Sequence, residues 1–430
     1  MRHFQPAFLS GKYLGFPLPF ILFLMQLLSW CHCFAGPGKL TGDRAVQGFV
    51  HNTDTGRTSP WFSSFFSANP ELLRWISSRK KSHGIQLIYT RIDRGANGNA
   101  VLQSEYFDVD PGSRFDPGLG GALPLGVFSL KRMAELHDSV GIDKFTTMLT
   151  EAGNAGLTPA YNDPTTADGK PALANYLKRM LVAGDAGAYN RIFEFAGRQY
   201  VGKCLSALGY TQVHLPARIG GRFTAEQNRY SNPVVFYDDD LNVQYRIPSQ
   251  YAASQTEGPG RKEEKNLAGI EDLHNMLVSL VFPNRFTREK RFDISAEDQG
   301  FLFHYMGLLP SESILPPYRD DTVRYFPCLR KLLYCGGSKG DTLSAGLRIF
   351  NVSDTANGRL LDVAYFADTT AKTEFFLSAT VTRTPGTFLA EDPALDFLKR
   401  LGRAVYAMEL KRPRRFPPNL KSYFSGYGGK

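Results

Sequence analysis

Histidine and cysteine are scarce in this chain, which has 8 His and 5 Cys among 430 residues. Neither a CxxC pair nor a His/Cys cluster has the spacing of a zinc site, so the sequence predicts no metal and no cofactor. Blocks of Lys and Arg with interleaved aromatic residues are missing as well, which argues against nucleic-acid binding. The short run Lys411–Arg415 contains a proline and is interpreted as a solvated C-terminal edge.

Apolar residues, in contrast, are plentiful enough for a sizeable core. Hydrophobic residues make up 43% of the chain and charged residues 21%, which is typical of a folded globular protein. The length allows one large domain or two ordinary ones. The net charge of +9 is modest for a chain of this size.

The N-terminus has the pattern of a secretory signal peptide. A weakly basic start is followed by the apolar run Phe16–Trp30, and Cys33-Phe34-Ala35 then places small residues before a cleavage point at Gly36. The run is short for a membrane span and contains two prolines. We therefore expect residues 1–35 to be removed, leaving a secreted or periplasmic protein without a transmembrane domain. A retained N-terminal anchor is the alternative.

Three cysteines remain after the predicted signal peptide. Cys204 lies on a helix-like stretch and is interpreted as a buried apolar residue. Cys328 and Cys335 could form a disulfide in an oxidising compartment, but their spacing alone leaves the pairing open.

Strand patterns occur at both ends of the chain and helix patterns in its middle. A linker is expected over residues 36–60 and a first helix over Trp61–Arg79. The predicted strands are Ile85–Asp93, Val101–Val109, Gly346–Phe350, Arg359–Asp368 and Glu374–Arg383. The other predicted helices are Leu123–Val140, Ile142–Ala152, Pro171–Ala183, Ala188–Leu208, Glu263–Leu280 and Pro393–Lys411, with a long irregular stretch at Pro216–Gln255.

The stretch Arg114–Pro124 (RFDPGLGGALP) joins the first strands to a long helix. Free N–H groups at a helix start favour negative charge, so such a junction is a good place for chemistry. An acyl-transfer enzyme would place its nucleophile here, whereas this chain has glycine, leucine and alanine.

Several segments resemble class A β-lactamase-like serine hydrolases of the serine β-lactamase and penicillin-binding-protein superfamily. They are IQLIYTRIDR, FDPG…LP, AGDAGAYNRIFEF, AEQNRYSNP, RIFN and LLDVAYFADTTAKTEFFLSATV, spread over roughly Trp61 to Leu410. The resemblance implies an α/β sandwich: a five-stranded, mainly antiparallel sheet flanked by terminal helices, plus an all-helical subdomain. The sheet subdomain would comprise residues 61–117 and 340–430, and the helical subdomain residues 118–339.

The catalytic motifs of that superfamily are degenerate here. In the family, S-x-x-K supplies a nucleophilic serine and a lysine that handles its proton. Laid on FDPGLGGALP, the serine position is Leu119 and the lysine position is Ala122. Neither side chain has a reactive atom.

The other two motifs have lost their functional groups as well. The S-D-N element corresponds to Gly184, Asp185 and Ala186, of which only the aspartate remains, and we expect it to cap a helix. The lysine of K-T-G corresponds to Val352, and Asp354, which follows, would repel a substrate carboxylate.

Four further residues are candidates for lining the old cleft: Tyr189, Glu226, Asn228 and Arg229. For the last three, a loop held together by hydrogen bonds is an equally good interpretation. The histidines have no mutual spacing and are interpreted as structural. Ser77-Ser78-Arg79-Lys80 matches S-x-x-K literally but lies outside the expected context.

Taken together, the resemblance implies a secreted pseudoenzyme that has kept the scaffold and has a cleft able to bind a small molecule or an envelope partner. An active serine hydrolase with a shifted nucleophile, acting on β-lactams or peptidoglycan-like peptides, is the alternative. A third interpretation is an interaction protein without a small ligand, which a cleft filled by its own side chains would favour.

Overall fold

The structure is a computed structural model that describes residues 56–153, 155–253, 265–420 and 423. The predicted signal peptide at 1–35 and most of the predicted linker at 36–60 lie outside these residues. Within the described part, none of the helices is long and apolar enough to cross a bilayer.

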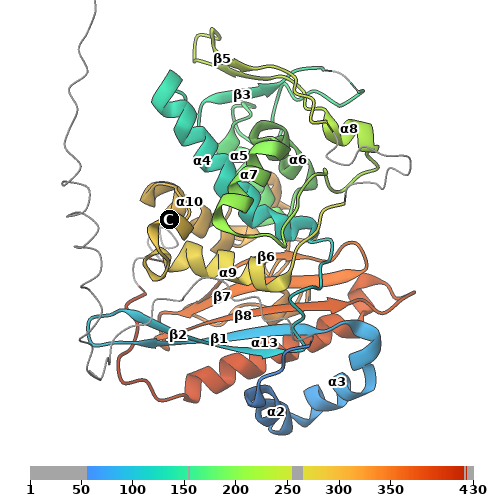
Figure 1. Cartoon of the computed structure of the whole chain (residues 1–430), viewed down its shortest axis with the longest axis vertical. Helices are drawn as coiled ribbons and strands as arrows, with labels where there is room; N and C mark the ends of the chain where they lie inside the picture. Colours follow the sequence, from blue (N-terminus) through green and yellow to red (C-terminus); the bar gives the residue numbers. More distant parts are fainter. Residues whose placement is uncertain (1–55, 154, 254–264, 421–422, 424–430) are drawn as a thin grey trace, which may run out of the picture. The chain divides into compact units, whose positions relative to one another are not determined.

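A five-stranded sheet with strand order β2-β1-β8-β7-β6 is the centre of the fold (Figure 1). All four pairings are antiparallel. Its strands are β1 Gln86–Arg94, β2 Ala100–Phe107, β6 Leu347–Asp354, β7 Arg359–Asp368 and β8 Thr373–Thr382. The alternating and apolar runs at both ends of the chain thus form one sheet, which confirms the expected architecture.

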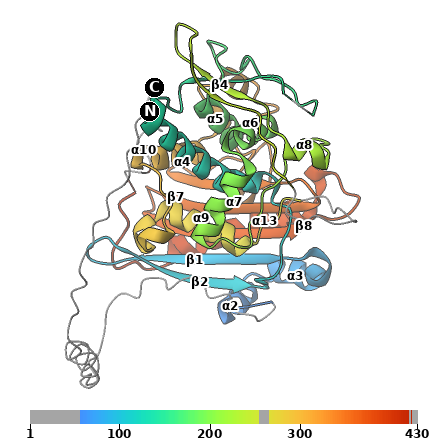
Figure 2. The same cartoon turned by 45° about the horizontal axis from the view of Figure 1, so that its top comes forward.

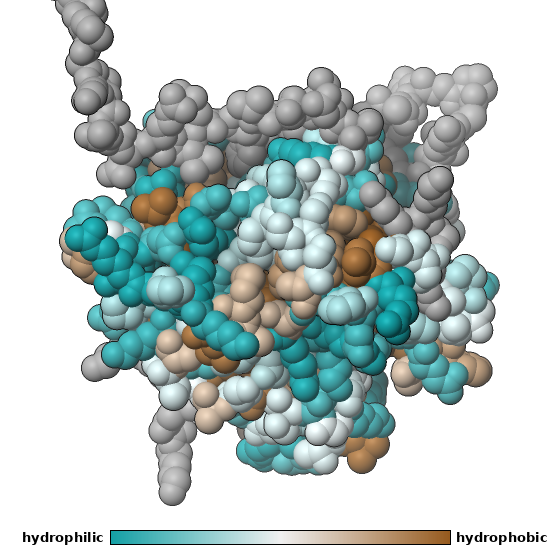
Figure 3. Space-filling model, turned by 90° about the horizontal axis from the view of Figure 1, so that it is seen from below, coloured by the Kyte–Doolittle hydropathy of each residue, from teal (hydrophilic) through white to brown (hydrophobic). Residues whose placement is uncertain are grey.

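Helices from the two ends of the chain cover one face of the sheet. They are α2 Pro60–Ser67, α3 Pro70–His83 and α13 Pro393–Lys411. Trp75 of α3 stacks on Phe397 of α13 with ring centroids 4.1 Å apart. Asp392 is the N-cap of α13: its carboxylate accepts the Ala394 N–H at 3.0 Å and so satisfies a free donor of the first turn. Figure 3 views the molecule from this side and shows a mainly hydrophilic surface with separate hydrophobic patches.

Most of the remaining helices lie on the opposite face of the sheet (Figure 2), whereas the short helix α12 packs against α13. Helix α9 contacts β7 and β8 directly, and α10 contacts β6. The longer helices are α4 Ala122–Val140, α5 Leu173–Ala183, α6 Ala186–Ala196, α7 Arg198–Leu208, α9 Ile270–Val281 and α10 Ala296–Gly307. Shorter ones are α8 Ala225–Arg229, α11 Pro316–Asp320, α12 Leu332–Cys335 and the 3-10 turns Gly118–Gly121 (η1), Pro283–Arg285, Arg288–Lys290, Pro310–Glu312 and Leu389–Glu391.

Residues 118–339 are not all-helical, which corrects the expectation. They contain a second, three-stranded antiparallel sheet, β3-β4-β5. Its strands are β3 Thr147–Thr150, β4 Val234–Tyr237 and β5 Val243–Ile247. The predicted helix Ile142–Ala152 is wrong because Thr147 and Thr150, which are β-branched, pair with β4. The stretch Pro216–Gln255 is likewise partly regular, since it contains α8, β4 and β5.

Two predicted helices are each divided in two. The helix expected over Trp61–Arg79 ends before Pro70, because proline has no N–H to continue the helical bonds. The helix expected over Ala188–Leu208 is broken at Gly197, whose φ of +76° suits glycine. Helix α10 was not predicted.

Cys328 and Cys335 form a disulfide with their Cα atoms 5.9 Å apart, which answers the question that spacing left open. Cys204 is free and only partly buried, rather than a fully buried core residue.

The C-terminal basic run is not a simply solvated edge. Arg412 and Arg414 both bind the carboxylate of Glu409, which is fully buried. Their side chains are only 16% and 9% exposed, so these cations belong to the packed interior of the sheet subdomain.

Candidate functional site

The strand–loop–helix junction begins with a tight contact between two motif positions. Gly118 has a φ of +48°, and a Cβ there would lie 1.7 Å from Oδ2 of Asp354. Only glycine fits both that backbone conformation and that approach. η1 and α4 follow directly, with Leu119 only 9% exposed and Ala122 3% exposed. The two positions that would hold a nucleophile and its base are therefore part of the core.

The carboxylate of Asp354 occupies the start of this helix. It accepts backbone hydrogen bonds from Leu119, Thr355 and Ala356. Burial raises the pKa of Asp354, while the charge of Arg330 and these three N–H groups oppose the rise. The N–H of Leu119, which is free to bind an anion in an isolated helix start, is engaged by the protein's own carboxylate.

Arg330 fills the space beside the second motif. A Cβ on Gly184, whose φ is +70°, would lie 2.7 Å from Nη1 and 2.9 Å from Cζ of Arg330. The guanidinium also donates to the carbonyl of Ser353. Burial lowers the pKa of Arg330, and the charges of Asp354 and Asp362 oppose the decrease. One cation thus connects Gly184, where the sequence predicted the S-D-N serine position, to the strand end that carries Asp354.

Tyr189 closes the same region from α6 and is fully buried. A Cβ on Gly121 would lie 2.9 Å from the Tyr189 hydroxyl, which has no hydrogen-bond partner among the described residues. Burial and the charges of Asp116 and Asp354 raise the pKa of Tyr189. The phenol is therefore protonated and lies near two carboxyl groups.

These contacts define what we call the plug: Asp354, Arg330 and Tyr189 packed around Gly118–Gly121 and Gly184. The plug brings together Leu119, Gly184, Tyr189 and Asp354 of the predicted site. Sequence reasoning missed Arg330, which lies far from every motif. Its signal is the segment CLRKLLYC, in which two adjacent cations stand between leucines inside a cysteine-bounded turn.

Asp185 caps a helix, as predicted. Its Oδ1 accepts the Ala188 N–H at 3.0 Å, and its Oδ2 accepts Nη2 of Arg179 at 2.7 Å. Burial raises the pKa of Asp185, but the Arg179 charge and the cap hydrogen bond outweigh it and lower the pKa overall. Ala186 packs against the loop at Gly220, where a Cβ would come within 2.4 Å of the Ala186 Cβ.

Val352 is a core residue of β6. It pairs with Val363 of β7 and is 3% exposed, so it neither lines a cleft nor replaces the family's lysine in function.

Glu226, Asn228 and Arg229 on α8 make contacts within their own loop. Oδ1 of Asn228 accepts the Arg218 N–H at 3.0 Å, and Nη1 of Arg229 lies 3.5 Å from Oε2 of Glu226. Arg218 is anchored in turn by the buried carboxylate of Glu194 at 2.7 Å. These bonds favour the interpretation in which the three residues hold the loop.

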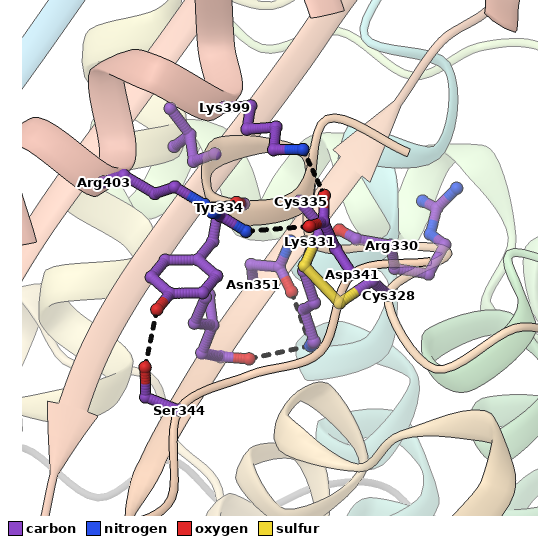
Figure 4. The surroundings of a disulfide bond; sticks show 12 residues. Cys328, Arg330, Lys331, Tyr334, Cys335, Asp341, Ser344, Asn351, Lys399 and Arg403 are labelled. Atoms are coloured by element: carbon purple, nitrogen blue, oxygen red, sulfur yellow. Dashed lines mark hydrogen bonds and ion pairs between the residues drawn. A yellow bond between two sulfur atoms is a disulfide. The ribbon is translucent and has the colours of Figure 1, made fainter. Parts of the chain in front are cut away.

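A buried lysine, Lys331, follows Arg330 of the plug in the chain (Figure 4). Nζ of Lys331 donates to the carbonyls of Met306 and Ile349 and to Oδ1 of Asn351, at 2.7 to 2.8 Å. Nδ2 of Asn351 donates to Asp362, which also accepts the Leu333 N–H. Burial lowers the pKa of Lys331 and raises that of Asp362, and the attraction between the two charges opposes both shifts. Lys331 has no serine among these partners.

A serine–histidine pair does occur, in the sheet core. Nδ1 of His274 lies 2.8 Å from Oγ of Ser378, and Nε2 lies 2.9 Å from Oγ1 of Thr90. His274 is 2% exposed and Ser378 fully buried, so a substrate cannot reach them. Burial lowers the pKa of His274 to about 3. The histidine is structural, as predicted.

The pKa of His274 predicts acid sensitivity. Because the unfolded histidine titrates near 6.5, the unfolded state binds one more proton than the folded state between about pH 6.5 and 3, and stability falls on acidification by about 1.4 kcal/mol per pH unit. Urea unfolding at several pH values should show a shallower slope for His274→Gln than for the unchanged protein. The exposed His137→Gln should keep the slope; equal slopes in all three proteins would refute the assignment.

The plug predicts a measurable response to small carboxylates. Asp354→Ala should lower the free energy of unfolding by about 1–3 kcal/mol per orphaned N–H or cation, because these groups lose their acceptor. Formate should then raise the melting temperature of this variant more than that of the unchanged protein. Asp320→Ala, at an exposed carboxylate, should give neither effect. A variant that loses stability but ignores formate would contradict the role of Asp354 as a bound anion.

No protein-family model matches the chain, and no curated protein sequence matches it. Among solved structures, a β-lactamase from Sphaerobacter thermophilus matches with a TM-score of 0.47 and 11% identity over 81% of this chain and 99% of that one. This chain is similar in fold to β-lactamases.

Two further solved structures are comparable. A class A β-lactamase from Bacteroides cellulosilyticus has a TM-score of 0.46 and 12% identity, over 80% of this chain and 98% of that one. The penicillin-binding protein PBP-A has a TM-score of 0.46 and 14% identity, over 83% and 98%. Within the described residues, no group of three or more His, Cys, Asp or Glu is placed to hold a metal ion.

Proposed function

We propose that this protein is a secreted, β-lactamase-like pseudoenzyme that acts as a scaffold or interaction protein. The observation that carries the proposal is the plug. A leucine stands at the nucleophile position, and the carboxylate of Asp354 takes the Leu119 N–H that would otherwise stabilise a developing oxyanion. The predicted signal peptide and the Cys328–Cys335 disulfide support an oxidising compartment outside the cytoplasm.

The plug also favours an interaction protein over a binder of small molecules in the old cleft. Leu119, Tyr189 and Asp354 are each at most 9% exposed, so these three predicted site residues offer little surface to a small ligand. The alternative, a serine hydrolase with a shifted nucleophile, requires a serine and a base within hydrogen-bond reach in an open site. Lys331 and the Ser378–His274 pair are both enclosed in the core.

The proposal is tested by an activity assay and by a covalent labelling assay. The purified protein should neither turn over nitrocefin nor become labelled by a fluorescent penicillin under conditions in which an active class A β-lactamase does both. Gly118→Ala should remain equally inactive. Stoichiometric acylation of this chain, mapped to one serine by mass spectrometry, would overturn the proposal and identify the shifted nucleophile.

A further inference from the structure

A cavity of about 640 Å³ lies between α4, α7 and the loop 288–293, lined by none of the plug residues. Phe128 and Phe292 line it, with ring centroids 6.0 Å apart in an edge-to-face arrangement. Ala207 and Leu208 at the end of α7 extend the apolar wall. The volume falls in the range of small-molecule pockets.

The rim of this cavity is charged and contains cations of both helix α4 and the loop 288–293. Lys131, Arg288 and Arg291 face Glu289 and Asp293. Asp293 is already neutralised by Nζ of Lys131 at 2.7 Å, an interaction that lowers the pKa of Asp293. Lys131 also binds Glu135 at 3.2 Å, so its charge is shared by two carboxylates. The cations that remain for an anionic ligand are Arg288 and Arg291, which line the cavity beside Glu289.

The rim is held in place before any ligand arrives. Besides the Lys131–Asp293 pair, Nζ of Lys290 donates to the carbonyl of Leu208 at 3.2 Å. Nε of Arg291 donates to the carbonyl of Phe286 at 2.9 Å. These bonds tie the loop to α4, to the end of α7 and to itself, so binding costs little reordering.

We propose that this cavity binds a small amphipathic anion, an apolar body with one carboxylate or sulfonate. The apolar body lies over Phe128 and Phe292, and the acid group lies between Arg288 and Arg291. Cys204 is on the cavity wall with a partly exposed thiol, so it reports occupancy. Burial raises the pKa of this thiol, and labelling is best done at mildly alkaline pH.

The experiment uses 1-anilinonaphthalene-8-sulfonate as a fluorescent probe and dodecanoate as its competitor. We expect saturable fluorescence that dodecanoate displaces and dodecanol does not. At a ligand concentration of about ten times the dissociation constant, iodoacetamide labelling of the Cys204 peptide should slow about tenfold. Ala207→Trp should fill the cavity and abolish binding, and Arg291→Glu should weaken it at least tenfold.

Ser206→Trp is the matched control, because Ser206 is an exposed neighbour on α7 that does not line the cavity. It should bind like the unchanged protein, and far-ultraviolet circular dichroism should show that all variants are folded. Probe binding that survives both Ala207→Trp and Arg291→Glu would overturn the proposal, as would dodecanoate that leaves Cys204 labelling unchanged. Equal competition by dodecanol would exclude an anion site.

Discussion

Replacing Lys331 by alanine is expected to lower the free energy of unfolding by about 3–5 kcal/mol, as measured by urea denaturation. Lys331 is 2% exposed, and its ammonium group is the shared donor for two backbone carbonyls and Asn351. Without it, these three acceptors and the nearby carboxyl of Asp362 stay buried with fewer partners. The loss comes from the groups left behind rather than from the intrinsic strength of the lysine's own bonds.

Lys399→Ala is the matched control. Lys399 pairs with Asp341 at a site where its side chain is 28% exposed, and Arg403 also binds that carboxylate. An ion pair of this kind contributes about 0–1 kcal/mol, so this variant should remain close to the unchanged protein. Comparable losses in the two variants would contradict the role assigned to the buried network.

Gly402→Ala is expected to destabilise the protein by about 3 kcal/mol, although alanine is the better helix former. Gly402 lies in the middle of α13, where a Cβ would come within 1.3 Å of the carbonyl oxygen of Leu333. Leu333 belongs to α12, which packs directly on α13. Because the obstacle is a backbone carbonyl, it cannot rotate away, and the two helices must separate.

Gly300→Ala should change the free energy of unfolding in the opposite direction. Gly300 is inside α10, and a Cβ there would meet nothing within 4 Å. This substitution should therefore stabilise by about 1 kcal/mol through helix propensity alone. Thermal unfolding of the two variants side by side separates packing from propensity, and a stabilised Gly402→Ala would show that α12 and α13 are not in this contact.

The five-stranded sheet was predictable because the residue pattern within each strand is itself typical of a β-strand. Val101–Val109 and Arg359–Asp368 are rich in β-branched, aromatic and apolar residues, and both were placed within two residues of the observed strands. The strands of the second sheet were not found, because β3 and β4 have four residues each and depend on tertiary pairing. A segment of that length does not distinguish a strand from part of a helix by periodicity.

The candidate site was predictable only where a motif supplied the position. Leu119, Gly184 and Asp354 were singled out because neighbouring residues fixed their register in the family motifs. The plug was not, since it depends on Arg330 arriving from a distant turn and on the missing Cβ of Gly118. The distances between these residues depend on how whole helices and strands pack. No short stretch of the sequence indicates them.

The pairing of β1 with β8 has a consequence for biosynthesis. At about 5–20 residues per second, the roughly 280 residues that separate these strands take about 15–60 seconds to translate. During this time the β1–β2 hairpin has an unpaired edge, which is a template for pairing with other chains. The ribosome-bound chain should therefore depend on a holding chaperone until β8 emerges, and a circular permutant that joins the two ends should remove that dependence.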